Sequence, residues 1–65
     1  MPIVKIDLWE GRTREQKDKL IEAVTKVVYE TIGCPSEAVQ VLLQDYKKED
    51  WGINGKPSSK ANPQA

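Results

Sequence analysis

Apolar and polar residues alternate along the first segment of the chain, residues 2–8. On an extended backbone three apolar side chains fall on one face and two charged side chains on the other: Val4, Ile6 and Leu8 against Lys5 and Asp7. A period of two is typical of a strand that buries one face. We therefore predict a strand over residues 2–8, which Glu10 and Gly11 end.

The next segment repeats its apolar residues with the period of a helix. Its apolar positions share one stripe, which consists of Leu20, Ile21, Val24, Val27, Val28 and Ile32. Thr13 and Gln16 have the spacing of a capping box, in which each side chain bonds to the backbone N–H of the other residue. Gly33 suits a left-handed C-terminal cap, and Pro35 prevents continuation. We predict one helix between Thr13 and Gly33.

A second strand is predicted over residues 39–46, where side chains again divide between two faces. One face is apolar and consists of Val39, Val41 and Leu43. The other face is mixed and consists of Gln40, Leu42, Gln44 and Tyr46. Because the mixed face is too apolar to be simply solvated, we expect it to contact another subunit.

The rest of the chain predicts a turn, a hairpin and a tail. Residues 47–50 form a charged turn. Trp51-Gly52-Ile53 followed by Asn54-Gly55 predicts a short hairpin, because Asn-Gly suits a type I′ turn. The remaining residues, about 56–65, are polar and predict a loose C-terminal tail.

Strand, helix and strand make one βαβ unit in a single α+β domain over residues 1–65. A helix of about nineteen residues at ~1.5 Å per residue matches the length of strands of seven or eight residues at ~3.3 Å. The helix therefore crosses back over the sheet, which leaves the strands parallel and the crossover right-handed. Sheet edges and one sheet face stay uncovered, and pairing between subunits would bury both.

Length and composition also favour assembly. A chain of 65 residues buries little apolar surface by itself, and the usual remedies are disulfides, a metal or oligomerisation. Cys34 is the only cysteine and the chain has no histidine, so we predict neither a disulfide framework nor a metal site. Oligomerisation is the remedy that remains.

The charge pattern excludes some partners. Ten basic residues balance ten acidic ones, so we expect no nucleic-acid partner, which would require a basic face. No apolar run approaches the ~20 residues of a membrane span. The N-terminus lacks the basic and long apolar regions of a signal peptide. We therefore expect a soluble, cytoplasmic protein without a membrane partner.

Several short motifs, in this order and spacing, resemble the 4-oxalocrotonate tautomerase family over roughly residues 2–60. The motifs are Pro2-Ile3-Val4, Leu8-Trp9-Glu10-Gly11-Arg12, Glu15-Gln16-Lys17 and Trp51-Gly52-Ile53. The resemblance implies βαβ subunits that form dimers and then a hexamer. It also implies an N-terminal proline as general base, which moves a proton between enol and keto forms of acidic 2-oxo compounds, typically from aromatic catabolism, without a cofactor.

The resemblance makes Pro2 the expected catalytic residue. Removal of Met1 would expose a secondary amine, which must be neutral to accept a proton. An ordinary α-amino group has a pKa of about 7.7–8.0 and a proline amine is more basic, so a pocket has to lower that pKa. Apolar walls and a nearby cation both do so, and a base tuned towards the working pH transfers protons efficiently.

The same resemblance assigns substrate-binding roles to Arg12 and Trp51. The family's arginine at the position of Arg12 binds a substrate carboxylate, and a guanidinium can make two charge-assisted hydrogen bonds to it. The aromatic residue at the position of Trp51 walls the pocket. Without the resemblance, we would interpret Arg12 as a solvated surface residue and Trp51 as a packing residue.

Gln40 departs from the family pattern. Well-known members carry a second arginine at this strand position, which binds substrate and polarises its carbonyl oxygen. Gln40 can donate a hydrogen bond but has no charge to stabilise a developing anion. Three interpretations stay open: another donor such as a backbone N–H, a related monoacid such as an arylpyruvate enol, or a different subunit that supplies the arginine.

The remaining polar residues predict no chemistry of their own. Cys34 has no histidine to activate it, so we interpret it as a packed thiol. Tyr46 is interpreted as an interface residue rather than a proton donor. We expect Lys47 and Lys48 to be solvated in the charged turn.

We predict an isomerase, a cofactor-free keto–enol tautomerase of small enol or 2-oxo acids, that assembles as a homo-hexamer, a trimer of dimers. Pro2 would carry the proton, with Arg12, Trp51 and Gln40 around the substrate. A hydrolytic dehalogenase is a weaker alternative, because the hairpin offers Ile53 where such an enzyme needs a carboxylate. A non-catalytic or partner-dependent assembly subunit is the other alternative.

Overall fold

The computed structural model describes residues 2–61 and, of these, the side chains of residues 2–59. Three long elements form the body of the molecule: β1 (Ile3–Trp9), α1 (Arg14–Ile32) and β2 (Gln40–Tyr46). A short helix, η1 (Ser36–Ala38), lies between α1 and β2. Four short elements follow β2: η2 (Lys48–Asp50), β3 (Gly52–Ile53), β4 (Lys56–Pro57) and α2 (Ser58–Ala61). The predicted elements therefore exist, with each strand shifted by one residue from its expected start.

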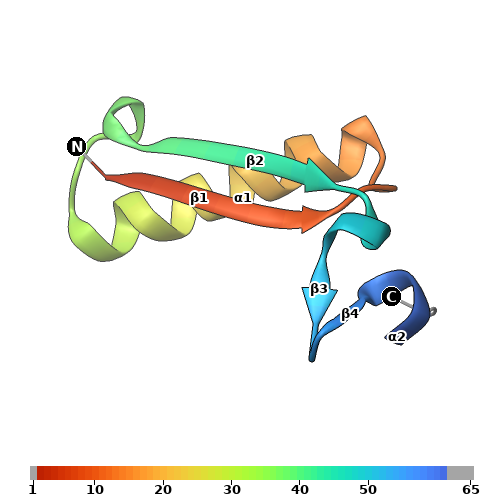
Figure 1. Ribbon diagram of the computed structural model, residues 1–65. Coiled ribbons are helices and arrows are strands. Elements are labelled where there is room, and N and C mark those ends of the chain that lie inside the picture. Colours follow the sequence, from red (N-terminus) through yellow and green to blue (C-terminus); the bar gives the residue numbers. More distant parts are fainter. Residues whose placement is uncertain (1, 62–65) are drawn as a thin grey trace.

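β1 and β2 pair in parallel, with Ile3 opposite Gln40 and Trp9 opposite Tyr46. The helix α1 runs behind this two-stranded sheet and covers one of its faces (Figure 1). The predicted βαβ unit with parallel strands is confirmed. Because the strands are parallel, their amino ends lie together at one end of the molecule and their carboxyl ends at the other.

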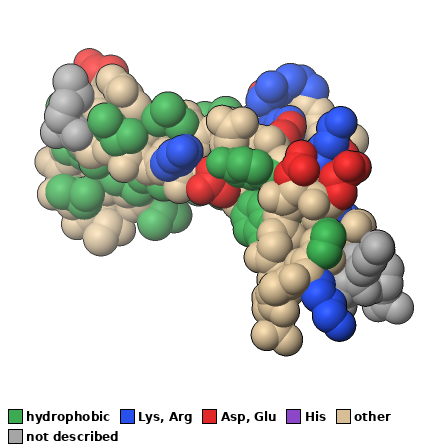
Figure 2. Space-filling model, viewed as in Figure 1, with side chains coloured by type: hydrophobic (Ala, Val, Ile, Leu, Met, Phe, Trp, Pro, Cys, Tyr) green, Lys and Arg blue, Asp and Glu red, His purple; other side chains and the backbone are tan. Residues whose placement is uncertain are grey.

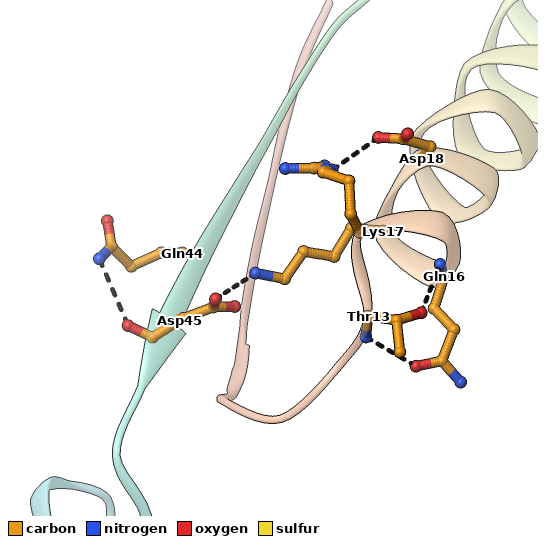
Figure 3. A network of polar contacts seen from close by, with 7 residues as sticks. Thr13, Gln16, Lys17, Asp18, Gln44 and Asp45 are labelled. Carbon is orange, nitrogen blue, oxygen red and sulfur yellow. Dashed lines mark hydrogen bonds and ion pairs between the residues drawn. The ribbon is translucent and has the colours of Figure 1, made fainter.

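Local signals set both ends of α1. Thr13 Oγ1 accepts a hydrogen bond from the Gln16 backbone N–H at 3.1 Å, and Gln16 Oε1 accepts one from the Thr13 N–H at 3.0 Å (Figure 3). Gly33 adopts a left-handed conformation with φ of 84° and donates its N–H to the Tyr29 carbonyl. The capping box and the glycine cap are therefore both confirmed.

An ion pair joins the start of the helix to the end of the sheet. The ammonium of Lys17 reaches across to the Asp45 carboxylate at the carboxyl end of β2 (Figure 3). The Lys17 side chain is only 18% exposed, so its pairing is less screened than those on the outer helix surface. This contact fixes the first turn of α1 relative to the strand ends.

The sheet is covered on one face only. Side chains that face α1 are half-buried and consist of Val4, Ile6, Leu8, Val41 and Leu43. On the opposite face Ile3 is 64% exposed and Leu42 48% exposed, and apolar surface stays visible across this side (Figure 2). Among residues 2–59, no apolar side chain is fully buried. A chain without a closed core needs further contacts to be stable, as expected for a subunit of an assembly.

The apolar stripe of α1 is wider than the sheet beneath it. Val24 and Val28 are half-buried, whereas Val27 is 62% exposed and Ile32 64% exposed. Two strands offer a narrow surface, so the margins of the stripe stay uncovered. Within the described residues no helix combines the length and apolar character that a membrane crossing requires.

The C-terminal hairpin is confirmed, but the prediction of a loose tail from residue 56 is wrong for residues 56–61. Asn54 and Gly55 have positive φ values of 54° and 81°, as a type I′ turn requires. β4 and α2 follow, and Ser58 is fully buried. Its N–H donates to the Trp51 carbonyl and its hydroxyl to the Lys48 carbonyl, both at 2.8 Å. The polar composition of this segment gave no indication of these hydrogen bonds. Residues 62–65 of the expected tail lie outside the described residues.

Candidate active site

Pro2 and Gln40 lie together at the amino end of the sheet. The Gln40 backbone N–H donates a hydrogen bond to the Pro2 carbonyl oxygen, at 3.0 Å between nitrogen and oxygen. Pro2 is half-buried, while the Gln40 side chain is exposed. The pairing of the two parallel strands thus places the expected base beside the expected neutral hydrogen-bond donor.

Arg12 and Trp51 lie at the opposite end of the sheet. Arg12 follows the turn at Gly11, whose φ of 112° suits a glycine, and its side chain is exposed. It lines a shallow depression between β1 and the start of α1, together with Ile6, Leu8, Gln16, Lys17 and Leu20. The apolar floor beside this guanidinium suits a small acid with a carbon skeleton.

One chain does not bring the expected site residues together. β1 has seven residues, which at ~3.3 Å each separate Pro2 from the turn before Arg12 by about 23 Å. Trp51 likewise follows the carboxyl end of β2. A site that contains Pro2, Arg12 and Trp51 therefore requires a second subunit, whose amino end meets this carboxyl end.

Trp51 belongs to an aromatic cluster that also contains Trp9 and Tyr46. The Trp9 and Trp51 ring centroids are 6.1 Å apart with planes at 75°, and those of Tyr46 and Trp51 are 5.6 Å apart at 77°. Such edge-to-face pairs contribute about 0.5–1.5 kcal/mol beyond their buried area. The cluster holds Trp51 at the sheet end as part of an apolar wall.

Sequence reasoning did not single out Trp9. Its odd position on β1 places it on the uncovered face, in register with Tyr46, and this pairing was the signal that could have identified it. Its indole Nε1–H is shielded from solvent and has no hydrogen-bond partner among the described residues. An unpaired buried donor costs about 1–3 kcal/mol, which lowers the stability of the single chain at this position.

Lys48 also differs from its prediction as a solvated turn residue. Its side chain is half-buried, and its Nζ lies 5.2 Å from the centroid of the Trp9 ring. The turn of η2 carries the lysine over the aromatic cluster, and an ammonium over a tryptophan face is attracted by the ring. Lys47, by contrast, is exposed as expected.

The two sheet ends have complementary chemistry. The amino end offers the Pro2 nitrogen, a secondary amine once Met1 is removed, and the Gln40 amide. The carboxyl end offers a guanidinium, which suits a carboxylate, and an aromatic surface, which lowers the local polarity. Together they suit proton transfer on a small organic acid.

A comparison with known proteins decides the family. The family model for tautomerase enzymes matches residues 2–61 of this chain. The chain belongs to the tautomerase family. The resemblance to 4-oxalocrotonate tautomerase and the prediction of an isomerase with tautomerase activity are confirmed.

Individual relatives agree with this assignment. The chain is 47% identical over 55 residues to a 2-hydroxymuconate tautomerase of Comamonas testosteroni, a match that covers 85% of this chain and 87% of the relative. The crystal structure of TomN, a 4-oxalocrotonate tautomerase homologue of the tomaymycin biosynthetic pathway, superposes with a TM-score of 0.87 at 34% identity and covers 97% of this chain and 100% of TomN.

A third relative bears on assembly. A heterohexamer 4-oxalocrotonate tautomerase from Chloroflexus aurantiacus superposes with a TM-score of 0.88 at 25% identity, covering 92% of this chain and 97% of its own. The tautomerase thus has a relative that functions as an assembly of several subunits. The open sheet face and the divided site residues of this chain are consistent with assembly.

Proposed function

We propose that this tautomerase isomerises a small enol acid of the 2-hydroxymuconate type without a cofactor and with Pro2 as the general base. The observation that carries the proposal is the division of the site between the two sheet ends, Pro2 at one and Arg12 with Trp51 at the other. A chain arranged in this way forms a complete acid-binding site only where two subunits meet. The name of the Comamonas relative supports the substrate class.

The reaction is a proton transfer with no change in composition. The Pro2 nitrogen, unprotonated after Met1 removal, takes the proton of the enol hydroxyl, and the oxygen lone pair forms the carbonyl. The displaced electron pair moves along the conjugated chain to a carbon atom, which takes the proton back from Pro2. Base and acid are the same group, so a pKa near the working pH serves both steps.

The other site residues bind the substrate and stabilise charge. Arg12 binds a carboxylate through charge-assisted hydrogen bonds. Trp51, held by the aromatic cluster, excludes water beside the amine and favours its neutral form. The Gln40 amide donates a hydrogen bond to the oxygen on which negative charge develops.

The assembly that we propose is a homo-hexamer, a trimer of dimers, in the cytoplasm. The exposed apolar positions on the open sheet face and at the margin of α1 support it, because both surfaces need cover. The heterohexameric relative supports an assembly of the same size, and it makes a hexamer with more than one kind of chain the alternative. A role in the breakdown of aromatic compounds follows from the substrate class.

The test is the rate of ketonisation of 2-hydroxymuconate by protein whose intact mass shows that Met1 is absent. The Pro2→Ala variant keeps the strand start but replaces a secondary amine by a less basic primary amine. We expect it to lower kcat about 10²–10⁴-fold, the range of one general base, while the size of the assembly stays unchanged.

Two results would contradict the proposal. Equal rates for wild type and Pro2→Ala would exclude Pro2 as the base. A wild-type rate no faster than buffer would exclude this substrate, and the enol of phenylpyruvate would then test whether the site takes a monoacid.

A further inference from the structure

Lys48 is the one lysine among residues 2–59 whose side chain is half-buried and whose ammonium has no acidic partner. Three others have acidic partners: Lys5 with Asp7, Lys17 with Asp45, and Lys19 with Glu15. Lys48 has no acidic partner and no side-chain hydrogen bond within residues 2–59, although Glu49 and Asp50 follow it directly. Its cationic group is therefore available to an anion at the aromatic cluster.

The proposed substrate has more negative charge than the site residues named so far can neutralise. A 2-hydroxymuconate has two carboxylates, and Arg12 provides one guanidinium. Gln40 is neutral, so it cannot pair with the second carboxylate by charge. A second cation near the wall formed by Trp9 and Trp51 would pair with the second carboxylate.

We propose that Lys48, held over the Trp9 ring, binds the second carboxylate of a dicarboxylate substrate. The inference rests on the proposed function, since it assigns a further substrate-binding residue to the same site. Lys48 follows β2 and Arg12 follows β1, so the two cations flank the same end of the sheet. A diacid bound across this end of the sheet would thus have a cation on either side of it, Arg12 towards the face covered by α1 and Lys48 over the aromatic cluster on the open face.

The geometry at Trp9 suits this role. The Lys48 Nζ is 5.2 Å from the ring centroid, so the ammonium is positioned over the ring without being neutralised. A cation–π contact is worth about 0.5–2 kcal/mol, whereas a carboxylate makes a stronger, directional charge-assisted bond. A carboxylate oxygen supplies the partner that the ammonium lacks.

The backbone beneath Lys48 is held independently of its side chain. The Lys48 carbonyl oxygen accepts the Ser58 hydroxyl at 2.8 Å and the Trp51 N–H at 3.2 Å. Substitution of the lysine side chain therefore leaves these hydrogen bonds of η2 in place. A change in ligand binding can then be assigned to the ammonium rather than to a lost turn.

The experiment compares the binding of trans,trans-muconate and sorbate, which share a six-carbon diene and differ by one carboxylate. The chain has two tryptophans, both in the aromatic cluster, so quenching of their fluorescence reports a ligand at this wall. The variants are Lys48→Gln, Lys48→Arg and, as a matched control, Lys47→Gln at the exposed neighbouring lysine. All are prepared as full chains without Met1.

We expect Lys48→Gln to weaken muconate binding about tenfold, the effect of ~1.4 kcal/mol, and to leave sorbate binding within about twofold. Lys48→Arg should retain most of the muconate affinity because it restores the charge. Lys47→Gln should bind both ligands like wild type. The difference between the two ligands separates charge pairing from packing against Trp9.

Three results would overturn the inference: no muconate binding by wild type, unchanged muconate binding by Lys48→Gln, or equal weakening of both ligands in that variant. None of these titrations depends on turnover. Wild type that binds muconate through Lys48 but does not ketonise 2-hydroxymuconate would refute the proposed reaction and still support the proposed dicarboxylate site.

Discussion

The two ends of the β1–β2 sheet are built in different ways. At the amino end, Pro2 is held by the main chain, through the hydrogen bond from the Gln40 N–H to its carbonyl oxygen. At the carboxyl end, Trp9, Trp51 and Lys48 are held by side-chain packing. In the reaction that we propose, the two ends have different roles: the amino end supplies the base and the carboxyl end binds the substrate.

This division ties activity to assembly. A strand of seven residues keeps the two ends apart within one chain, so neither end is a complete site. The absence of fully buried apolar side chains among residues 2–59 leads to the same conclusion from stability. Loss of the assembly should therefore remove both the fold and the reaction, whereas loss of a single site side chain, such as that of Pro2 or Arg12, should remove only the reaction.

The largest effect is expected from a charge on the open sheet face. Leu42 is 48% exposed in the single chain and, in our account, is covered in the assembly. Leu42→Arg would place a cation in that apolar contact, where an unpaired buried charge is strongly destabilising. We expect sedimentation to show dissociated chains and circular dichroism to show loss of cooperative unfolding.

A control at the outer helix surface makes that result specific. Glu22 is exposed on α1, so Glu22→Arg adds the same residue away from the open face. It should assemble like wild type. If Leu42→Arg also assembles and unfolds like wild type, the open sheet face is not an interface.

Arg12 should show the next largest effect, confined to the carboxyl end. Arg12→Ala removes charge-assisted hydrogen bonds worth about 1.5–3 kcal/mol, so we expect kcat/KM to fall by one to two orders of magnitude, without change in assembly. Arg12→Lys should recover part of the loss, because it keeps the charge but not the two-pronged geometry. Steady-state kinetics with 2-hydroxymuconate measure both, and wild-type kcat/KM in Arg12→Ala would refute the role.

The smallest effect is expected from the helix cap, which belongs to neither end of the site. Thr13→Ala removes the side-chain acceptor of the Gln16 N–H and should lower the free energy of unfolding by about 1 kcal/mol. Thr13→Ser keeps the hydroxyl and should restore most of it. Urea unfolding at one fixed protein concentration measures the change, and kcat/KM should stay at the wild-type value. A stability loss equal in both variants would show that the cap is not the cause.

Features set by neighbouring residues were predictable from sequence. The capping box at Thr13 and Gln16, the glycine cap at Gly33 and the turn at Asn54-Gly55 each depend on a few adjacent residues, and all three are present. The parallel pairing of the strands was also predictable from the sequence, because the lengths of the elements leave few ways to connect a strand, a helix and a strand.

Features set by contacts between distant segments were not predictable in the same way. Trp9 and Trp51 are far apart in sequence and meet only because η2 turns back beside β1. The same turn brings Lys48 over Trp9, and Ser58 is buried through bonds to residues that polar composition does not reveal. The separation of Pro2 from Arg12, by contrast, follows from the predicted strand over residues 2–8, which at ~3.3 Å per residue keeps the two residues apart.

Mixing two inactive variants tests the central account most directly. Pro2→Ala and Arg12→Ala chains are unfolded together in equal amounts, refolded and assayed for ketonisation of 2-hydroxymuconate, with each variant refolded alone as control. If every site takes Pro2 from one subunit and Arg12 from another, about a quarter of the sites contain both wild-type residues, and about a quarter of wild-type activity returns. If both residues come from the same chain, no site in the mixture is complete, and activity stays at the level of the separate variants.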